Sequence, residues 1–126
     1  MILLDTNIYI YFLEKNPEFF ESSEKAIKEA LQYGVIPLPT ITVMEIMSGT
    51  DNKKVLNFFT EGQFKICDFT LNTAVLAGKL RYGHKALKAA DAIQIATAME
   101  QKATYFITND EKLLKLNLKE IEIRNL

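Results

Sequence analysis

Residues 2–7 read ILLDTN, and this short stretch sets a pattern that the rest of the chain repeats. Its apolar residues favour a short buried strand, and Ile8, Tyr11 and Phe12 then recur at the spacing of a helix. Asp5 stands at the point where the strand stops. A carboxylate in this position either caps the helix that follows or forms one corner of a metal site.

Strands and helices are expected to alternate along the whole chain. The pattern predicts strands at 2–5, 35–39, 64–69, 104–110 and, as an exposed or edge strand, 120–125. It predicts a first helix that stops before Asn16–Pro17, and further helices at 18–33, 40–49, 51–62, 71–82, 88–101 and 111–116. Pro37 and Pro39 indicate a strand end or a sheet edge, because proline donates no ladder hydrogen bond. The sequence therefore predicts an α/β fold with a central parallel sheet of four or five strands, covered on both faces.

The composition is that of one folded domain spanning residues 1–126. Hydrophobic residues make up 48% of the chain and charged residues 25%, which argues against disorder. A net charge of -1 argues against a protein that coats nucleic acid through bulk charge, but it leaves room for a local basic patch. The lone Cys67 excludes an intrachain disulfide and is expected as a small buried residue. Without a signal peptide or a membrane span, a cytoplasmic protein with no membrane contact is expected.

Four acidic residues are predicted to meet at one edge of the sheet. Asp5 follows the first strand, Asp110 follows the fourth, and Glu45 is expected in the first turn of the helix after the second strand. The carboxyl ends of parallel strands share an edge, where ligands bind in such folds. The helix that contains Asp91 leads into the fourth strand, so it must begin near the same edge, with Asp91 in its first turn.

Helix capping is the competing explanation for each of these acids. Free N–H groups and the helix dipole favour acids at helix starts, and Thr42–Glu45 and Thr108–Glu111 both have the spacing of a capping box. Carboxylates gathered at one edge repel one another, however, and stability gives no reason to gather them. Mg²⁺ or Mn²⁺ does, because both prefer oxygen ligands, whereas zinc is disfavoured without Cys or His. Asn7 and Thr108 stand beside the acids, where they can hydrogen-bond a carboxylate, a water or a phosphate.

Four short stretches, taken in order, resemble the PIN-domain ribonucleases, in particular the VapC-type toxins of toxin–antitoxin modules. They are LLDTNIYI (3–10), TVMEI (42–46), KAADAIQIATA (88–98) and FITND (106–110), and together they cover essentially the whole chain. The resemblance implies a three-layer α/β/α sandwich and a Mg²⁺- or Mn²⁺-dependent endoribonuclease. It also implies an RNA substrate, a homodimer and inhibition by a small cognate antitoxin protein.

The resemblance assigns the catalytic and metal-binding roles to Asp5, Glu45, Asp91 and Asp110, with Asn7 and Thr108 in support. In this interpretation, metal ions held by the acids activate a water that attacks an RNA phosphodiester in line. Other readings remain. A phosphatase of the haloacid dehalogenase kind would use Asp5 as a nucleophile, but it needs an acid at position 7, where Asn7 stands. A PIN-fold protein acting in RNA processing, or as a non-catalytic protein-binding module, is the further alternative.

A basic stretch precedes Asp91 and is the candidate contact for RNA phosphates. Within residues 79–91, Arg81, Lys85 and Lys88 are the proposed contacts, and an ordinary solvated helix end is the alternative. Tyr82 either packs or stacks on an unpaired base. Three further lysines are expected to form a solvated face: Lys112, Lys115 and Lys119. The aromatic residues, among them Phe58–Phe59, are expected to be mostly core, with a surplus facing a partner.

Overall fold

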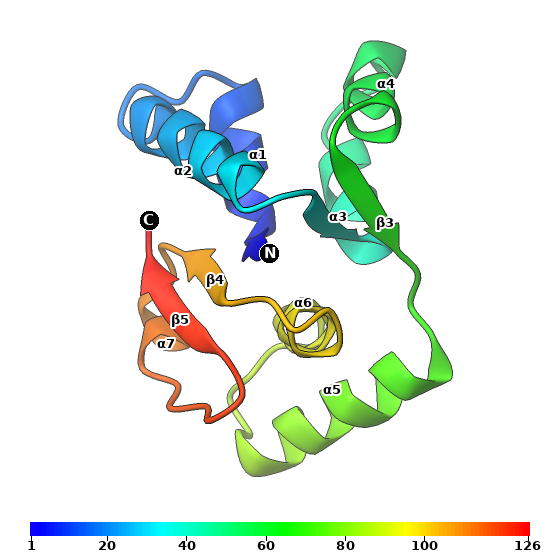
Figure 1. Cartoon of the computed structure of the whole chain (residues 1–126), viewed down its shortest axis with the longest axis vertical. Helices are drawn as coiled ribbons and strands as arrows, with labels where there is room; N and C mark the ends of the chain where they lie inside the picture. The colour runs from blue at the N-terminus through cyan, green and yellow to red at the C-terminus, as the bar shows by residue number, and fades with distance from the viewer.

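The computed structural model describes residues 1–126 and contains five strands and seven helices (Figure 1). The strands are β1 (Ile2–Leu4), β2 (Ile36–Pro39), β3 (Phe64–Cys67), β4 (Tyr105–Thr108) and β5 (Glu122–Asn125). The helices are α1 (Thr6–Leu13), α2 (Phe20–Gln32), α3 (Thr40–Met47), α4 (Lys53–Glu61), α5 (Leu71–Gly83), α6 (Ala89–Glu100) and α7 (Glu111–Leu114). Every expected element is present, with bounds that differ by a few residues.

All strand pairs are parallel, but the hydrogen-bonded ladder is divided into two parts. One part has the order β1-β4-β5 and the other pairs β2 with β3, while β1 and β2 lie side by side without a ladder between them. The prolines explain this division. The N–H of Ile36 donates to the carbonyl of Gln63 at 3.0 Å, so alternate residues of β2 face β3. Pro37 and Pro39 therefore face β1, and neither has an N–H to donate.

Side chains of the strands alternate between two hydrophobic cores, one on each face of the sheet. Ile2, Leu4 and Ile107 belong to one core, which they share with α1, α2 and Phe59 of α4. Leu3 and Phe106 belong to the other core, with residues of α5 and α6. Figure 1 shows α6 end-on, between α5 and the strands. The molecule is thus the expected α/β/α sandwich.

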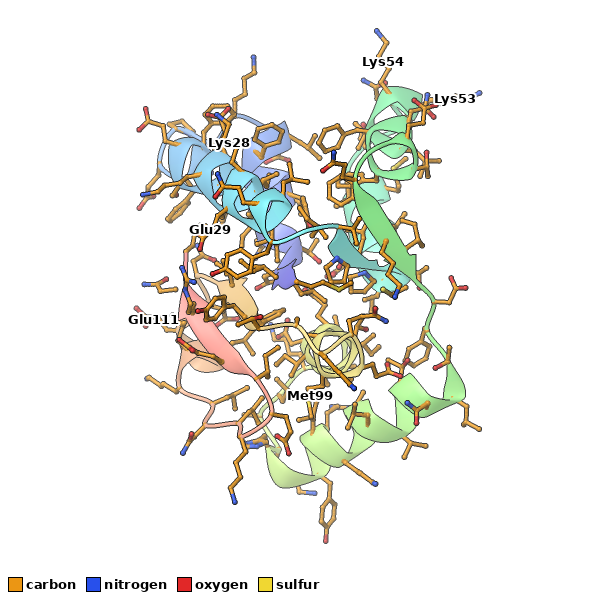
Figure 2. The ribbon with its side chains drawn as sticks, in the orientation of Figure 1. Lys28, Glu29, Lys53, Lys54, Met99 and Glu111 are labelled. Atoms are coloured by element: carbon orange, nitrogen blue, oxygen red, sulfur yellow. The ribbon has the colours of Figure 1, made fainter.

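The last strand is fastened to the helix layer by Arg124. Its guanidinium lies 3.3 Å from Glu29 of α2 and 4.3 Å from the ring centre of Tyr105 on β4. Figure 2 shows Glu29 on the side of α2 that faces β5, whereas Lys53 and Lys54 project from the outer end of α4. None of the helices combines the length and the apolar character needed to cross a membrane.

The structure contains neither of the two capping boxes that the sequence spacing allowed as the competing explanation. Helix α3 begins at Thr40, directly after Pro39, so Thr42 lies inside the helix and Glu45 lies in its second turn rather than its first. The residue that caps α7 is Asp110 and not Thr108, since the Asp110 carboxylate accepts from the N–H of Lys112 at 2.8 Å. A capping box does occur at the start of α5, between Thr70 and Thr73.

Candidate active site

Asp5 lies at the carboxyl end of β1 and is almost fully enclosed, with 5% of its surface exposed. The register that pairs Leu4 with Ile107 places Asp5 beside Thr108 at the end of β4. The buried hydroxyl of Thr108 donates to the Asp5 carboxylate at 2.7 Å. Burial raises the pKa of Asp5 above its usual value, and the hydrogen bond from Thr108 opposes this rise.

Thr108 also connects Asp5 to Asp110. The backbone N–H of Asp110 donates to the Thr108 hydroxyl oxygen at 3.0 Å, while the same hydroxyl donates its proton to Asp5. One side chain therefore fixes the acid that follows β1 and the turn that carries the acid after β4. This arrangement explains why a hydroxyl at the last position of a buried strand remains satisfied without water.

Glu45 is held by a polar network that joins α1, α3 and α6. Its Oε1 accepts from the hydroxyl of Thr6 at 2.8 Å and from Nε2 of Gln94 at 3.3 Å. The backbone N–H of Thr6 donates to Oε1 of Gln94 at 3.3 Å, and the Thr6 hydroxyl lies 3.1 Å from that of Thr42. Thr6, Thr42 and Gln94 are all buried, so this network holds the Glu45 carboxylate from the interior of the protein.

Asp91 lies in the first turn of α6 and is half-buried. Its pKa is raised from 3.8 to about 6, chiefly by burial and then by the negative charges of Asp5, Asp110 and Glu45. The positive charge of Lys88 opposes this rise. The four acids thus lie close enough to act on one another electrostatically, although they come from four separate parts of the chain.

Capping does not explain the group as a whole. The Asp5 side chain makes no capping hydrogen bond to α1. Glu45 lies within α3 and accepts from side chains of α1 and α6. Only Asp110 accepts a hydrogen bond from a helix N–H. Asn7, the other residue expected in support, is exposed and makes no hydrogen bond with any of the acids.

The donor set fits a hard divalent cation held partly through water. No three carboxylate, imidazole or thiol groups are close enough together to ligate one ion directly. Mg²⁺ usually keeps several of its waters and binds through one or two carboxylates, which this arrangement of oxygen donors permits. The pKa of Asp91 is raised first by burial and then by repulsion from the other acids, and such a cation would relieve this repulsion.

A cavity of about 230 Å³ opens beside Asp91 and Asp110. It is lined by the segment 84–88 and by residues of and after α7, including Lys112, which was expected only on a solvated face. Of the three residues expected to contact RNA, Lys85 and Lys88 line this cavity. The third residue, Arg81, does not line the cavity. Its Nε donates to the carbonyl of Leu87 at 3.0 Å and so holds the segment 84–88 in place.

Tyr82 does not pack against the core, because 79% of its surface is exposed. The ammonium nitrogen of Lys85 lies 4.5 Å from the centre of its ring, which is the geometry of a cation–π contact. His84, the only histidine, lines the same cavity.

Sequence reasoning missed Gln94 as part of the site. The available signal was its position three residues after Asp91, since residues at that spacing share a helix face. A polar side chain on the buried face of an alanine-rich helix needs partners, and here these partners are Thr6 and Glu45.

Parallel strands between two helix layers define an α/β protein, and folds of this class bind ligands at the carboxyl edge of the sheet, where the carboxylates of this chain gather. A family model described as PIN domain matches residues 2–118, and the chain belongs to this family. A search of curated proteins gave no match.

Several solved structures share this fold over nearly the whole chain. One is a toxin–antitoxin complex from Klebsiella pneumoniae, with 26% identity, a TM-score of 0.74 and coverage of 96% of this chain and 95% of that one. Another is VapBC2 from Rickettsia felis bound to a promoter DNA fragment, with 22% identity, a TM-score of 0.75 and coverage of 100% and 99%. FitAcB from Neisseria gonorrhoeae follows at 25% identity, a TM-score of 0.69 and coverage of 99% and 97%.

Proposed function

We propose that residues 1–126 form one PIN domain that acts as a Mg²⁺- or Mn²⁺-dependent endoribonuclease, the toxin of a VapBC-type toxin–antitoxin module. The observation that carries the proposal is the gathering of Asp5, Glu45, Asp91 and Asp110 at one edge of the sheet. Burial, and then the negative charges of the other three acids, raise the pKa of Asp91, and no basic side chain forms a salt bridge with any of the four. An arrangement that costs stability in this way is typical of a functional site.

A bound divalent cation would supply Lewis-acid chemistry, activating a water for in-line attack and neutralising charge on the phosphate. Asp5, Glu45, Asp91 and Asp110 would hold it, directly or through water. Thr108 orients the Asp5 carboxylate through its donated hydrogen bond, and the Thr6–Gln94 pair orients Glu45. These residues prearrange the site, so that little reorganisation remains when a charged substrate enters.

The positive charge that an RNA backbone needs lies beside the acids. Lys85, Lys88 and Lys112 line the cavity that adjoins Asp91 and Asp110. They are the proposed phosphate contacts, because the chain as a whole carries no excess positive charge. Arg81 supports this surface indirectly, through its hydrogen bond to Leu87.

Exposed apolar side chains supply surface for the proposed antitoxin and for a second copy of the chain. Met44 of α3 is 59% exposed, Phe58 of α4 is 41% exposed and Leu71 of α5 is 82% exposed. Apolar side chains that gather into an exposed patch are typical of surfaces that other proteins cover, and these three residues are the proposed members of such patches. The similarity to a toxin–antitoxin complex at 26% identity supports an antitoxin as one of these partners.

The experiment that tests the proposal is cleavage of a mixture of structured RNAs by the purified protein in Mg²⁺, in Mn²⁺ and in EDTA. Asp5→Asn and Asp91→Asn should abolish the metal-dependent cleavage while the variants remain folded. Asp51→Asn is the matched control, because it neutralises an exposed carboxylate in the loop before α4. Cleavage that persists in EDTA, or in both site variants, would contradict the proposal.

One observation favours the alternative of a non-catalytic binding module, namely that no three carboxylates are close enough to ligate one ion. Melting curves with and without Mn²⁺ separate the two readings. The nuclease proposal requires Mn²⁺ to raise the melting temperature of the natural chain but not that of Asp91→Asn. Equal melting temperatures in both cases, together with intact binding of an antitoxin, would favour the binding module.

A further inference from the structure

The hydroxyl of Tyr11 links helix α1 to the turn that carries Asp110. This hydroxyl accepts a hydrogen bond from Nδ2 of Asn109 at 3.0 Å, between residues that are 98 positions apart in the sequence. Asn109 directly precedes Asp110, and both of these residues are half-buried, as is Tyr11. A side chain in the second half of α1 therefore holds the loop from which one of the four acids projects.

The same turn, residues 108–110, is also held from the side of the strands. The carbonyl of Thr108 accepts from the N–H of Leu126, just after β5, at 3.0 Å. The Thr108 hydroxyl accepts from the N–H of Asp110 at 3.0 Å. Both of these bonds run through Thr108, whereas the bond from Asn109 to Tyr11 is the one that holds the turn against α1.

Tyr11 is itself held in place by the packing of α1 on α2. Its ring stacks on that of Phe19, with 4.7 Å between the ring centroids and 27° between the planes. Its carbonyl accepts from the N–H of Asn16 at 2.9 Å, and the Asn16 side chain accepts from the N–H of Phe19 at 3.0 Å. The tyrosine is thus fixed before any metal or substrate binds, which is what a supporting residue of a site requires.

The carboxylate of Asp110 follows the position of its turn. One of its oxygens accepts from the N–H of Lys112 at 2.8 Å, so the carboxylate and the start of α7 form one local unit. If the turn shifts relative to α1, the carboxylate shifts with it. Residues that orient a metal ligand in this indirect way affect metal affinity without touching the metal.

We propose that Tyr11 is a positioning residue of the carboxylate site, which acts through Asn109 to set the place of Asp110. The inference rests on the metal site of the proposed function. It adds to that site a residue that makes no hydrogen bond with any of the four acids.

Tyr9 provides a matched control on the same helix. Its hydroxyl is buried and has no hydrogen-bond partner, whereas that of Tyr11 is bonded to Asn109. Tyr9→Phe and Tyr11→Phe each remove one oxygen atom and keep the ring. Only Tyr11→Phe takes a partner away from Asn109.

The test measures the affinity of the full chain for Mn²⁺ through the relaxation of water protons, with circular dichroism to verify that each variant is folded. Groups that orient metal ligands contribute ~10–100-fold to metal affinity, and Tyr11 acts one bond further away, so Tyr11→Phe should weaken Mn²⁺ binding about fivefold. Tyr9→Phe should bind Mn²⁺ as the natural chain does. Equal affinities in all three proteins, or an equal loss in the two variants, would overturn the inference.

RNA cleavage supplies a second measurement that a general loss of stability does not reproduce. Tyr11→Phe should lower kcat about fivefold and leave KM for RNA unchanged, because the substitution displaces a metal ligand and leaves the basic side chains in place. A change confined to KM would contradict a positioning role.

A double-mutant cycle with Asn109→Leu identifies the hydrogen bond as the cause. Asn109→Leu should weaken Mn²⁺ binding at least as much as Tyr11→Phe does, and Tyr11→Phe added to it should cause no further loss. Asn109→Ser takes the place of Asn109→Leu if the latter does not fold. Losses that multiply in the double variant would show that the two residues act separately, against the proposal.

Failure of this inference is distinguishable from failure of the nuclease proposal. If the natural chain binds Mn²⁺ and cleaves RNA while Tyr11→Phe does both equally well, the positioning role alone is wrong. If Mn²⁺ binding weakens in Tyr11→Phe but none of the proteins cleaves RNA, the positioning role is supported and the nuclease is contradicted. A natural chain that neither binds Mn²⁺ nor cleaves RNA would overturn both.

Discussion

The folded chain disfavours the negative charge of Asp91. Its pKa is raised from 3.8 to about 6, so the fold favours the neutral carboxyl. The resulting stabilisation is fully present below pH 3.8 and is lost as the pH rises through about 6. Asp5 contributes in the same direction, because burial also raises its pKa. Without metal, the protein is therefore expected to lose stability between pH 4 and 7.

Asp91→Asn should remove part of this loss. We expect the variant to be more stable than the natural chain at pH 7 in EDTA by about 1 kcal/mol, after allowance for the partial exposure of the side chain. The two proteins should differ little at pH 4. Denaturant unfolding at both pH values measures the difference, and Asp51→Asn should follow the natural chain. A natural chain that is as stable at pH 7 as at pH 4 would contradict the assignment.

Thr108 places Asp5 through a buried hydrogen bond, and its removal should be costly. Thr108→Val leaves the Asp5 carboxylate without its donor and the Asp110 N–H without its acceptor. Hydrogen bonds to charged groups contribute ~1.5–3 kcal/mol, so a loss of about 2 kcal/mol in unfolding free energy is expected. Thr108→Ser keeps the hydroxyl and should retain most of the stability. Equal losses in the two variants would show that the methyl group, and not the hydrogen bond, is responsible.

Removal of the Tyr9 hydroxyl, in contrast to that of the Thr108 hydroxyl, is not expected to lower stability. Its ring packs edge-on against Phe59 at 5.3 Å between centroids, but its hydroxyl is buried without a hydrogen-bond partner. Since an unsatisfied buried hydroxyl costs ~1–3 kcal/mol, Tyr9→Phe should leave stability unchanged or raise it by about 1 kcal/mol. Thermal unfolding measures the change. A loss of stability of more than about 1 kcal/mol would show that the Tyr9 hydroxyl has a hydrogen-bond partner in the folded protein.

At the scale of elements, periodicity predicted the helices and strands because local patterns decide them. The burial of Ile2 and Leu4 on one face and Leu3 on the other follows directly from the period of a strand. The same logic predicted that Asp5, Asp91 and Asp110 lie at one edge. The function of these residues remains a prediction.

The polar network around Glu45 was not predictable in the same way. It depends on the approach of Gln94 from α6 and Thr6 from α1, residues that are distant in the sequence. The turn of α3 that carries Glu45 was also misplaced, because Thr42–Glu45 has capping-box spacing while the helix begins at Thr40 after Pro39. Local motifs describe helix starts, but only the packing of three helices decides which polar groups meet.

Gln94 joins three helices, and its replacement should therefore weaken more than one element. Gln94→Leu removes the acceptor of the Thr6 N–H and a donor to Glu45, and both remaining groups are at least partly buried. We expect a loss of about 2–3 kcal/mol in unfolding free energy. Gln94→Glu retains an acceptor but adds a charge beside Glu45, so its loss should be larger at pH 7 than at pH 5. A loss independent of pH would contradict the proximity of the two carboxylates.

At the scale of the whole molecule, the proposed cation should stabilise the fold. A ligand present at 100 times its dissociation constant stabilises the folded state by ~2.7 kcal/mol. Because Asp91 must be ionised to bind a cation, the rise in melting temperature with Mn²⁺ should be larger at pH 7 than at pH 5. Melting curves at both pH values measure this difference. A Mn²⁺ effect that is equal at both pH values would show that Asp91 takes no part.

The divided ladder leaves the sheet in two separately hydrogen-bonded parts, and we expect these parts to differ in their protection from solvent exchange. Pro37 and Pro39 leave β1 and β2 in contact without shared backbone hydrogen bonds, so β2 and β3 can separate from β1 while the β1-β4-β5 ladder stays closed. Backbone amides of β3 should then exchange with deuterium through a partial opening, whereas those of β4 should exchange only on global unfolding. Glu45 lies in the helix that follows β2, in the part expected to open first, whereas Asp5 and Asp110 follow β1 and β4 in the other part. The carboxylate cluster therefore spans the boundary between the two hydrogen-bonded parts of the sheet, and the hydrogen bonds of Thr6 and Gln94 to Glu45 cross this boundary at the cluster.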